Sequence, residues 1–196
     1  MSSNDALAPP ISDPGHPVVV GSIVGMAAAT AFVMVNAGGL PSPWGTLARL
    51  AWVIAVAATV WNVLLRRRRL AVAPRPSGRA GLVYAASVLG MVAGIVGGAR
   101  LLVALERSEL VPALVVMVVG LHFIPFARAF SAPVFGVLGW AMTALGAIGL
   151  FVGWQVSGAV VASATATIAG FVMLIVMAAR AHPAGSVVPS PDVSAL

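Results

Sequence analysis

The chain has no cysteine and no lysine among its 196 residues. The absence of cysteine excludes disulfides, thiolate metal sites, cysteine nucleophiles and thiol redox relays. Charged residues of all kinds make up only 8 % of the chain, whereas a soluble domain carries roughly a quarter. So few charges cannot cover a surface that faces water. The composition therefore indicates a chain that is largely in contact with lipid.

Acidic and histidine side chains are also scarce. None of the five acidic residues lies in the middle of an apolar run, which argues against carboxylate-driven proton antiport and against Asp-rich lipid-phosphate transferases. His16, His122 and His182 are far apart, so no histidine cluster for a metal is expected. A haem held by two intramembrane histidines is excluded, although a His/Met pair is not. We expect no metal and no cofactor, and an enzyme is the less favoured class.

Long apolar runs dominate what is present. A membrane-spanning helix needs about 20 residues, with a range of roughly 17–25, and only helices or closed barrels satisfy every backbone group in lipid. The runs lack the alternation of barrel strands. The sequence therefore predicts an all-α integral membrane domain over residues 18–181, between flexible tails at 1–17 and 182–196. The six expected spans are 18–36, 44–65, 81–104, 110–127, 133–153 and 156–180.

The arginine distribution predicts the orientation. Six of the eleven Arg lie between positions 66 and 79, so this loop is expected in the cytoplasm. With six spans, both termini are then cytoplasmic. The Arg- and Ala-rich composition is typical of a high-GC bacterium, which favours a bacterial plasma membrane. The net charge of +6 is interpreted as a topology signal rather than a nucleic-acid site. The expected contacts of anionic lipid headgroups are Arg66, Arg67, Arg68 and Arg69.

Small residues recur at four-residue spacing in three of the predicted helices. Such a spacing forms a groove in which another helix backbone can approach closely, and in lipid this packing drives helix association. The alternatives are a pore lining, a moving interface, or a face that binds a second copy of the chain or another membrane protein. The sets are Gly21, Gly25 and Ala29; Ala86, Gly90, Gly94 and Gly98; and Gly139, Thr143 and Gly146.

Two further patterns concern the predicted hairpins and the bulky aromatic residues. Gly25-Met26 recurs as Gly90-Met91, which suits three repeated hairpins, although biased composition also produces such similarities.

Trp52 and Trp140 lie deep in their predicted spans. We expect both indole rings to be packed between helices.

Ionisable residues gather near the expected outer ends of the spans. Arg49, Arg100, Glu106 and Glu109 could form an ion-pair cluster there, and Glu106 and Glu109 would be one turn apart if the third helix continued. Surface pairs of this kind contribute about 0–1 kcal/mol. A structural role is favoured, and an outer vestibule is the functional alternative.

The most distinctive stretch surrounds His122 in the fourth span. Pro125 has no N–H, so it leaves the carbonyl of Leu121 without its helical partner, and Arg128 follows within two turns. A histidine in a spanning helix normally has a polar partner; Asn62, at a similar depth, is the candidate. A neutral His122 bonded to a neighbouring helix and a proton-relay, ligand-binding or substrate role both remain open. Gly120 and His122 face opposite ways, about 200° apart.

Gly120-Leu-His-Phe-Ile-Pro-Phe-Ala-Arg128 resembles a segment of small uncharacterised multipass membrane proteins of bacteria. The resemblance covers about nine residues, and it implies a multipass membrane location but no activity.

Three functions are compatible with these features. The first is a small-solute transporter or channel-like protein, with a polar path through Asn62, His122, Ser163 and Thr167. The second is a non-catalytic partner that binds another membrane protein through its glycine faces. The third is a membrane enzyme that uses His122, for which a lateral cavity holding His122 and Arg128 would be the signature.

The topology can be tested directly because the chain has no cysteine background. We expect Ser77→Cys, in the predicted cytoplasmic loop, to escape labelling by a membrane-impermeant maleimide in intact cells and to react after permeabilisation. Labelling in intact cells would contradict the orientation.

Overall fold

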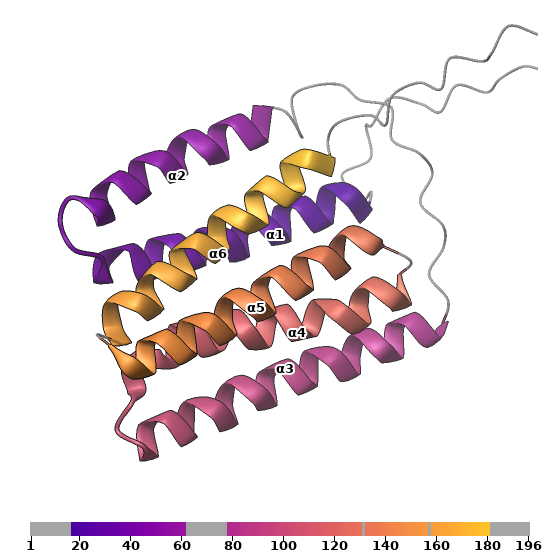
Figure 1. Ribbon diagram of the computed structural model, residues 1–196. Coiled ribbons are helices and arrows are strands. Elements are labelled where there is room, and N and C mark those ends of the chain that lie inside the picture. The colour runs from indigo at the N-terminus through magenta and orange to yellow at the C-terminus, as the bar shows by residue number, and fades with distance from the viewer. Residues whose placement is uncertain (1–16, 62–77, 131, 157, 181–196) are drawn as a thin grey trace, which may run out of the picture.

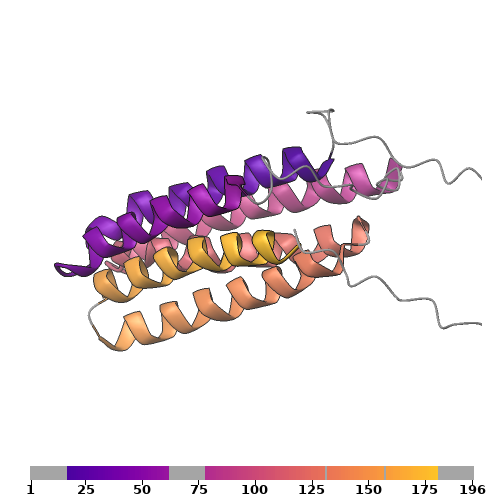
Figure 2. The same cartoon turned by 90° about the horizontal axis from the view of Figure 1, so that it is seen from above.

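The computed structural model describes residues 17–61, 78–130, 132–156 and 158–180. These residues form helices and no strand, which confirms the all-α prediction. The six long helices run along one common direction in both views of the bundle (Figures 1 and 2). They are α1 (Pro17–Asn36), α2 (Trp44–Val60), α3 (Gly78–Ala104), α4 (Val111–Ala129), α5 (Pro133–Gln155) and α6 (Gly158–Arg180), with the short 3-10 helices η1 (Ala37–Gly39) before α2 and η3 (Ser108–Leu110) before α4.

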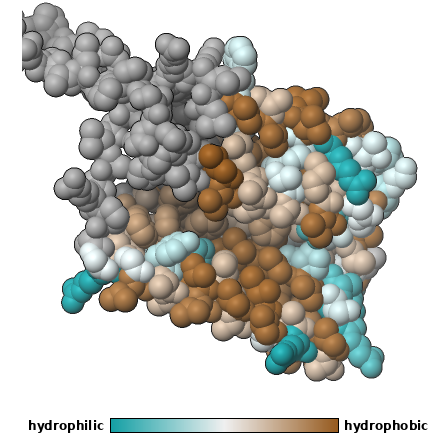
Figure 3. Space-filling view, turned by 180° about the vertical axis from the view of Figure 1, so that it is seen from behind, coloured by the Kyte–Doolittle hydropathy of each residue, from teal (hydrophilic) through white to brown (hydrophobic). Residues whose placement is uncertain are grey.

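Four segments are long and apolar enough to cross a membrane: α3, Ser108–Ala129, α5 and Gly158–Val176. The apolar stretches of the first two helices, Ile23–Gly39 and Trp44–Val60, are shorter within the described residues. Large apolar side chains are exposed along most helices. Hydrophobic residues cover most of the face seen in Figure 3, and the strongly hydrophilic ones lie mostly toward its margins. Such a surface is suited to contact with lipid, so the structure supports the assignment of this chain as a membrane protein.

The closest helix contact joins α4 to α5. A Cβ added to Gly146 of α5 would lie 2.6 Å from the Cα of Met117, and one added to Gly139 would lie 2.9 Å from the carbonyl oxygen of Gly120. Gly120 in turn meets the backbone of Thr143. The small residues predicted to pack on the fifth span therefore face α4, where they bring two backbones into direct contact.

The helix α6 provides the second centre of packing. A Cβ on Gly170 would lie 2.9 Å from the carbonyl oxygen of Ala29 in α1, and Ala166 and Ala169 are fully buried. From α2, Trp52 is only 2 % exposed and meets Phe171 of α6 edge to face, with the ring centroids 5.7 Å apart. The expectation that Trp52 packs between helices is confirmed.

The predicted hairpins are not equivalent packing units. The helix α1 packs more extensively on α6 than on α2, and α4 packs more extensively on α5 than on α3. The strongest contacts therefore cross from one hairpin to another, an arrangement that three repeated hairpins do not predict.

The helix α3 lies at the edge of the bundle opposite α2 (Figure 1) and packs mainly on α4. Its Gly94 and Gly98 face Val118 and Leu114 of α4, whereas a Cβ on Gly90 or Gly97 would have no described atom within 4 Å. Only part of the predicted small-residue stripe on this helix is therefore a packing face. The remainder is open.

Two leucine substitutions on α3 test this assignment. A Cβ at Gly94 would lie 3.1 Å from Cγ1 of Val118, so we expect Gly94→Leu to separate α3 from α4 and to cost about 1–3 kcal/mol, the usual range for overpacking. The matched variant Gly90→Leu, one turn away, should leave stability unchanged or slightly raised. Thermal unfolding in detergent measures both. Equal melting temperatures for the two variants would contradict the packing face.

Candidate functional site

The two ends of the bundle differ in their connections. The α1–α2, α3–α4 and α5–α6 connections lie at one end, whereas the α4–α5 turn lies at the other, where α3 begins (Figure 1). Three of the predicted site residues, His122, Pro125 and Arg128, lie in the last turns of α4, near the α4–α5 turn. Asn62 and the run Arg66, Arg67, Arg68 and Arg69 lie outside the described residues.

An aromatic cluster joins three helices at this end. Its members on α4 recur every three or four residues, which places them along neighbouring stripes of the helix. Phe126 is central: its ring centroid lies 4.5 Å from that of Phe130 and 4.9 Å from that of Phe135 on α5. We define the aromatic cluster as Tyr84, His122, Phe123, Phe126, Phe130 and Phe135.

The His122 ring is half-buried in this cluster and faces α3. Its centroid lies 6.2 Å from that of Tyr84, and the backbone of Ser87 is its polar neighbour on α3. The Nδ1 atom is buried and makes no hydrogen bond with the described residues. The expected partner, Asn62, falls in the undescribed part of the chain. The surroundings of His122 in the described structure are therefore mainly aromatic.

The opposed directions of Gly120 and His122 are explained by the position of α4. Gly120 meets Thr143 of α5, whereas His122 faces Tyr84 of α3. The helix α4 packs on α3, α5 and α6. It thus buries both sides, and each of the two residues lies at a different interface.

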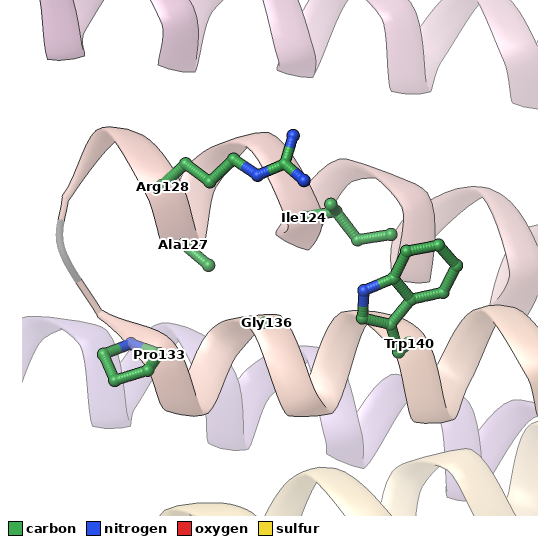
Figure 4. A pocket seen from close by; sticks show the side chains of 6 residues that line it. All are labelled: Ile124, Ala127, Arg128, Pro133, Gly136 and Trp140. Carbon is green, nitrogen blue, oxygen red and sulfur yellow. The ribbon is translucent and has the colours of Figure 1, made fainter.

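A pocket of about 360 Å³ lies between the adjoining ends of α4 and α5 (Figure 4). The α4 residues lining it follow helical spacing, i, i+3 and i+4, and the α5 residues follow i, i+3 and i+7, so each set lies on one side of its helix. The Cβ that Gly136 lacks would lie 3.5 Å from the Cβ of Ala127, so the two helices approach closely at that point. The lining residues are Ile124, Ala127, Arg128, Pro133, Gly136 and Trp140.

The pocket has a positive electrostatic character. Arg128 is exposed in the last turn of α4, and the lining contains no acidic residue. The Arg128 side chain runs toward Ile124 and Trp140, away from Pro133 at the start of α5 (Figure 4). An arginine binds anions through its N–H groups, so Arg128 makes the pocket suitable for an anion.

Sequence reasoning missed several residues of the pocket and of the aromatic cluster, among them Trp140 and Tyr84. The expectation that Trp140 packs between helices is wrong: the residue is 62 % exposed and forms one wall of the pocket (Figure 4). The spacing Pro133, Gly136, Trp140 was a usable signal, because these positions share one side of a helix. For Tyr84 the available signal was that it is the only tyrosine of the chain.

The structure separates His122 from Arg128. Six helical residues turn the chain by about 600°, so the two side chains point about 120° apart. Arg128 lines the pocket and His122 does not; Pro125 lies between them inside α4, which continues to Ala129. The pocket between α4 and α5 is therefore not the single cavity holding His122 and Arg128 that the enzyme hypothesis required.

The hydroxyls assigned to the polar path lie elsewhere. Ser163 of α6 is buried against Gly39 of η1. Thr167, one turn further along that helix, is buried too, and its Oγ1 has no partner among the described residues. His122, by contrast, faces α3. The structure does not bring His122 and these hydroxyls to one interface.

The predicted outer ion-pair cluster is only partly assembled. The salt bridge found in the described chain joins Arg107 to Glu109, with 3.7 Å between Nη1 and Oε1, and the Arg107 guanidinium lies 5.1 Å from the ring centroid of Trp154. It does not include Arg49, whose guanidinium lies beside Gly38, or Arg100, which is exposed.

Glu106 also lies outside this salt bridge. The helix α3 ends at Ala104, and Glu106 adopts a left-handed conformation with φ 57°. The third helix therefore does not continue through Glu106, and the one-turn spacing from Glu106 to Glu109 does not form.

No protein-family profile, no curated protein and no solved structure matches this chain. The described residues contain no group of three His, Asp or Glu that could hold a metal ion. The pocket and the aromatic cluster are therefore the features that bear on function.

The setting of His122 generates a stability prediction. We expect His122→Phe to keep or raise the melting temperature, because phenylalanine retains the aromatic contacts and removes a buried nitrogen without a partner. The comparison variant His122→Ala should lower it, since truncating a half-buried ring leaves a cavity. Thermal unfolding in detergent measures both. If His122→Phe is as destabilising as His122→Ala, a hydrogen bond of the ring, such as one to the Ser87 backbone, holds His122 in place.

Proposed function

We propose that this chain is a six-span protein of the bacterial plasma membrane, with both termini in the cytoplasm, and that it acts as a transporter-like protein for a small anionic solute. The observation that carries the proposal is the pocket at the α4–α5 end, which is lined by Arg128 and by no acidic residue. A cationic site at the end of a helix pair is suited to capture an anion at the membrane surface.

The positions of the cationic side chains support the proposed orientation. Arg79 at the start of α3 and Arg128 are both exposed, and α3 begins at the same end of the bundle as the α4–α5 turn (Figure 1). The arginine-rich loop that precedes α3 would join this end. Cytoplasmic arginines follow from the positive-inside rule, and Arg66, Arg67, Arg68 and Arg69 would contact anionic headgroups there.

Pro125 supports a transport role for the same region. Proline cannot donate the helical hydrogen bond to the residue four positions before it, and kinks in helices concentrate at proline. Ala127 and Arg128, two of the pocket residues, lie two and three positions after Pro125. A bend of α4 at Pro125 would move both residues and would open or close the pocket. Interrupted helices form the solute sites of many transporters.

Flux through reconstituted protein tests this proposal. We expect liposomes containing the protein to move at least one anion, from a panel of water-soluble organic anions and a fluorescent anionic amphiphile, faster than protein-free liposomes do. Because Arg128 supplies the side-chain charge of the pocket, Arg128→Gln should reduce the rate about tenfold, equivalent to about 1.4 kcal/mol.

The control for this assay is Arg100→Gln, which removes an exposed arginine far from the pocket and should leave the rate unchanged. Equal rates for protein-containing and protein-free liposomes across the panel would overturn the transport proposal. Equal losses in the two arginine variants would show that the pocket is not the site.

A second function is favoured by one observation on α3. Gly90 and Gly97 lie on the outward side of this helix, with space around the Cβ positions that they lack. In lipid, such small-residue faces allow another helix to approach. A non-catalytic role as a partner of another membrane protein, or of a second copy of this chain, would use that face.

A further inference from the structure

We infer that the side of α3 that carries Gly90 and Gly97 is the interface through which two copies of this chain form a parallel dimer in the membrane. This side is called the outward face of α3 below. The inference rests on the second function proposed above and names a second copy of the chain as the partner.

The helix α3 is the least buried of the four long apolar segments. Only 6 % of its apolar stretch is buried within the described structure, whereas at least 28 % is buried in each of the other three. Met91 and Ile95 pack on the buried cluster that α3 shares with α4. Leu89 and Ala93, two positions before each of these, point about 200° away from them. The outward face is therefore turned away from the bundle.

The two glycines of the outward face have no packing partner in a single copy. A Cβ on Gly90 or Gly97 would have no described atom within 4 Å, although glycine is among the least favourable residues inside a helix. In lipid, glycine favours helix association because it lets a second backbone approach closely. These two positions thus weaken α3 in a single copy and are compensated when another helix packs on them.

The outward face combines a ridge of large side chains with a groove of small ones. The ridge is formed by exposed residues at seven-residue spacing, Leu82, Leu89, Val96 and Val103. The groove lies beside it, and its exposed residues repeat with the same spacing: Ala86 and Ala93, and Gly90 and Gly97. A seven-residue repeat keeps each row in contact along a pair of helices that supercoil to the left.

This combination is complementary to itself. A two-fold symmetric interface uses the same patch on both copies, so the patch has to fit its own image. In a parallel pair of α3 helices, the ridge of each copy lies opposite the groove of the other. An unrelated membrane helix would need to carry the same pattern by coincidence, which is why a second copy is the favoured occupant.

The charges near the end of α3 also fit a second copy. Arg100, seven residues after Ala93, continues the middle of the outward face, and Glu106 lies just beyond the end of α3 at Ala104. Both are exposed, and neither takes part in the salt bridge found in the described chain. About 6 Å of helix separates Arg100 from the end of α3, a distance that an arginine side chain can span.

In a parallel dimer, Arg100 of each copy would therefore reach Glu106 of the other. Without these two ion pairs, the two Arg100 side chains would repel each other near the symmetry axis. Ion pairs beside a helix contact fix the orientation and the choice of partner, so this pairing favours the parallel arrangement over the antiparallel one.

The proposed dimer leaves the anion pocket complete within one copy. The pocket is lined from α4 and α5 alone, whereas the outward face belongs to α3. Association and flux are therefore separable. We expect Arg100→Gln to weaken the dimer and to leave the rate of anion flux unchanged.

Disulfide formation between single cysteines tests the interface in the cysteine-free chain. Ala93→Cys places a thiol in the middle of the outward face, close to the symmetry axis. Ile148→Cys is the control for random collision: it is exposed on α5 and lies as many residues from the start of its helix as Ala93 does. Each variant is reconstituted in phosphatidylcholine liposomes at high lipid excess and oxidised with copper phenanthroline. We expect a disulfide-linked dimer for Ala93→Cys and only background for Ile148→Cys.

A leucine in the groove should separate the two copies. We expect Gly97→Leu to weaken the association of Ala93→Cys about tenfold, which corresponds to about 1.4 kcal/mol. Gly81→Leu is the matched control: a Cβ there is equally open, but the position lies about 120° around α3 from Ala93, so cross-linking should not change. Unchanged melting temperatures in detergent show that both variants are folded.

Exchange of the two charges tests the parallel pairing. Arg100→Glu and Glu106→Arg should each reduce cross-linking of Ala93→Cys, because like charges then meet across the interface. The double exchange places opposite charges there again and should restore cross-linking.

Three results would overturn the inference. If Ala93→Cys and Ile148→Cys cross-link equally, α3 does not join two copies; the outward face then remains open to another membrane protein, and the anion flux is decided by its own assay. Equal effects of Gly97→Leu and Gly81→Leu would show that the groove is not part of the contact. A double charge exchange that stays as weak as the single ones would exclude the parallel arrangement.

Discussion

Direct contact between the backbones of α4 and α5 is the constraint on which the arrangement of this bundle depends. Gly120, Gly139 and Gly146 lack the Cβ atoms that would hold the helices apart, and α4 and α5 make the most extensive helix contact in the described structure. In lipid, apolar burial does not drive helices together, so close packing of this kind has to do so. The other helices attach to this pair: α3 through α4, and α1 and α2 through α6.

The same contact sets the position of the candidate site. Because Gly120 is turned toward α5, helical geometry turns His122 toward α3, where the aromatic cluster surrounds it. Toward the α4–α5 turn the helices still approach closely at Gly136 and Ala127, and the side chains of Ile124, Arg128 and Trp140 line the pocket beside this contact. A tight glycine contact and an open pocket are thus consecutive parts of one interface.

Hydrogen bonds within a single helix satisfy several of the buried hydroxyl groups of this bundle. Several threonine hydroxyls donate to the carbonyl four residues earlier in their own helix, among them Thr59 to Ala55 and Thr143 to Gly139. Such bonds let a helix carry a hydroxyl in lipid without a partner from another helix. Thr167 Oγ1 and His122 Nδ1 are the exceptions within the described chain. Their lack of a partner contrasts with the usual pairing of buried polar groups.

The sequence by itself determined the helical class, because apolar runs without the alternation of barrel strands satisfy their backbone groups in lipid only as helices. It also indicated where α5 begins, since a first-turn proline such as Pro133 loses no helical hydrogen bond.

Which side of each helix is buried was decided only by the tertiary structure. Gly90 and Gly94 belong to the same four-residue pattern, yet only Gly94 meets a neighbouring helix. Trp52 and Trp140 lie equally deep in their spans, yet one is buried and the other lines the pocket. The physical reason is that lipid and protein interiors are both apolar, so hydrophobicity along the chain does not distinguish a lipid-facing side from a packed one. The fit between individual side chains on neighbouring helices decides which side is buried, and this fit exists only once the helices are packed together.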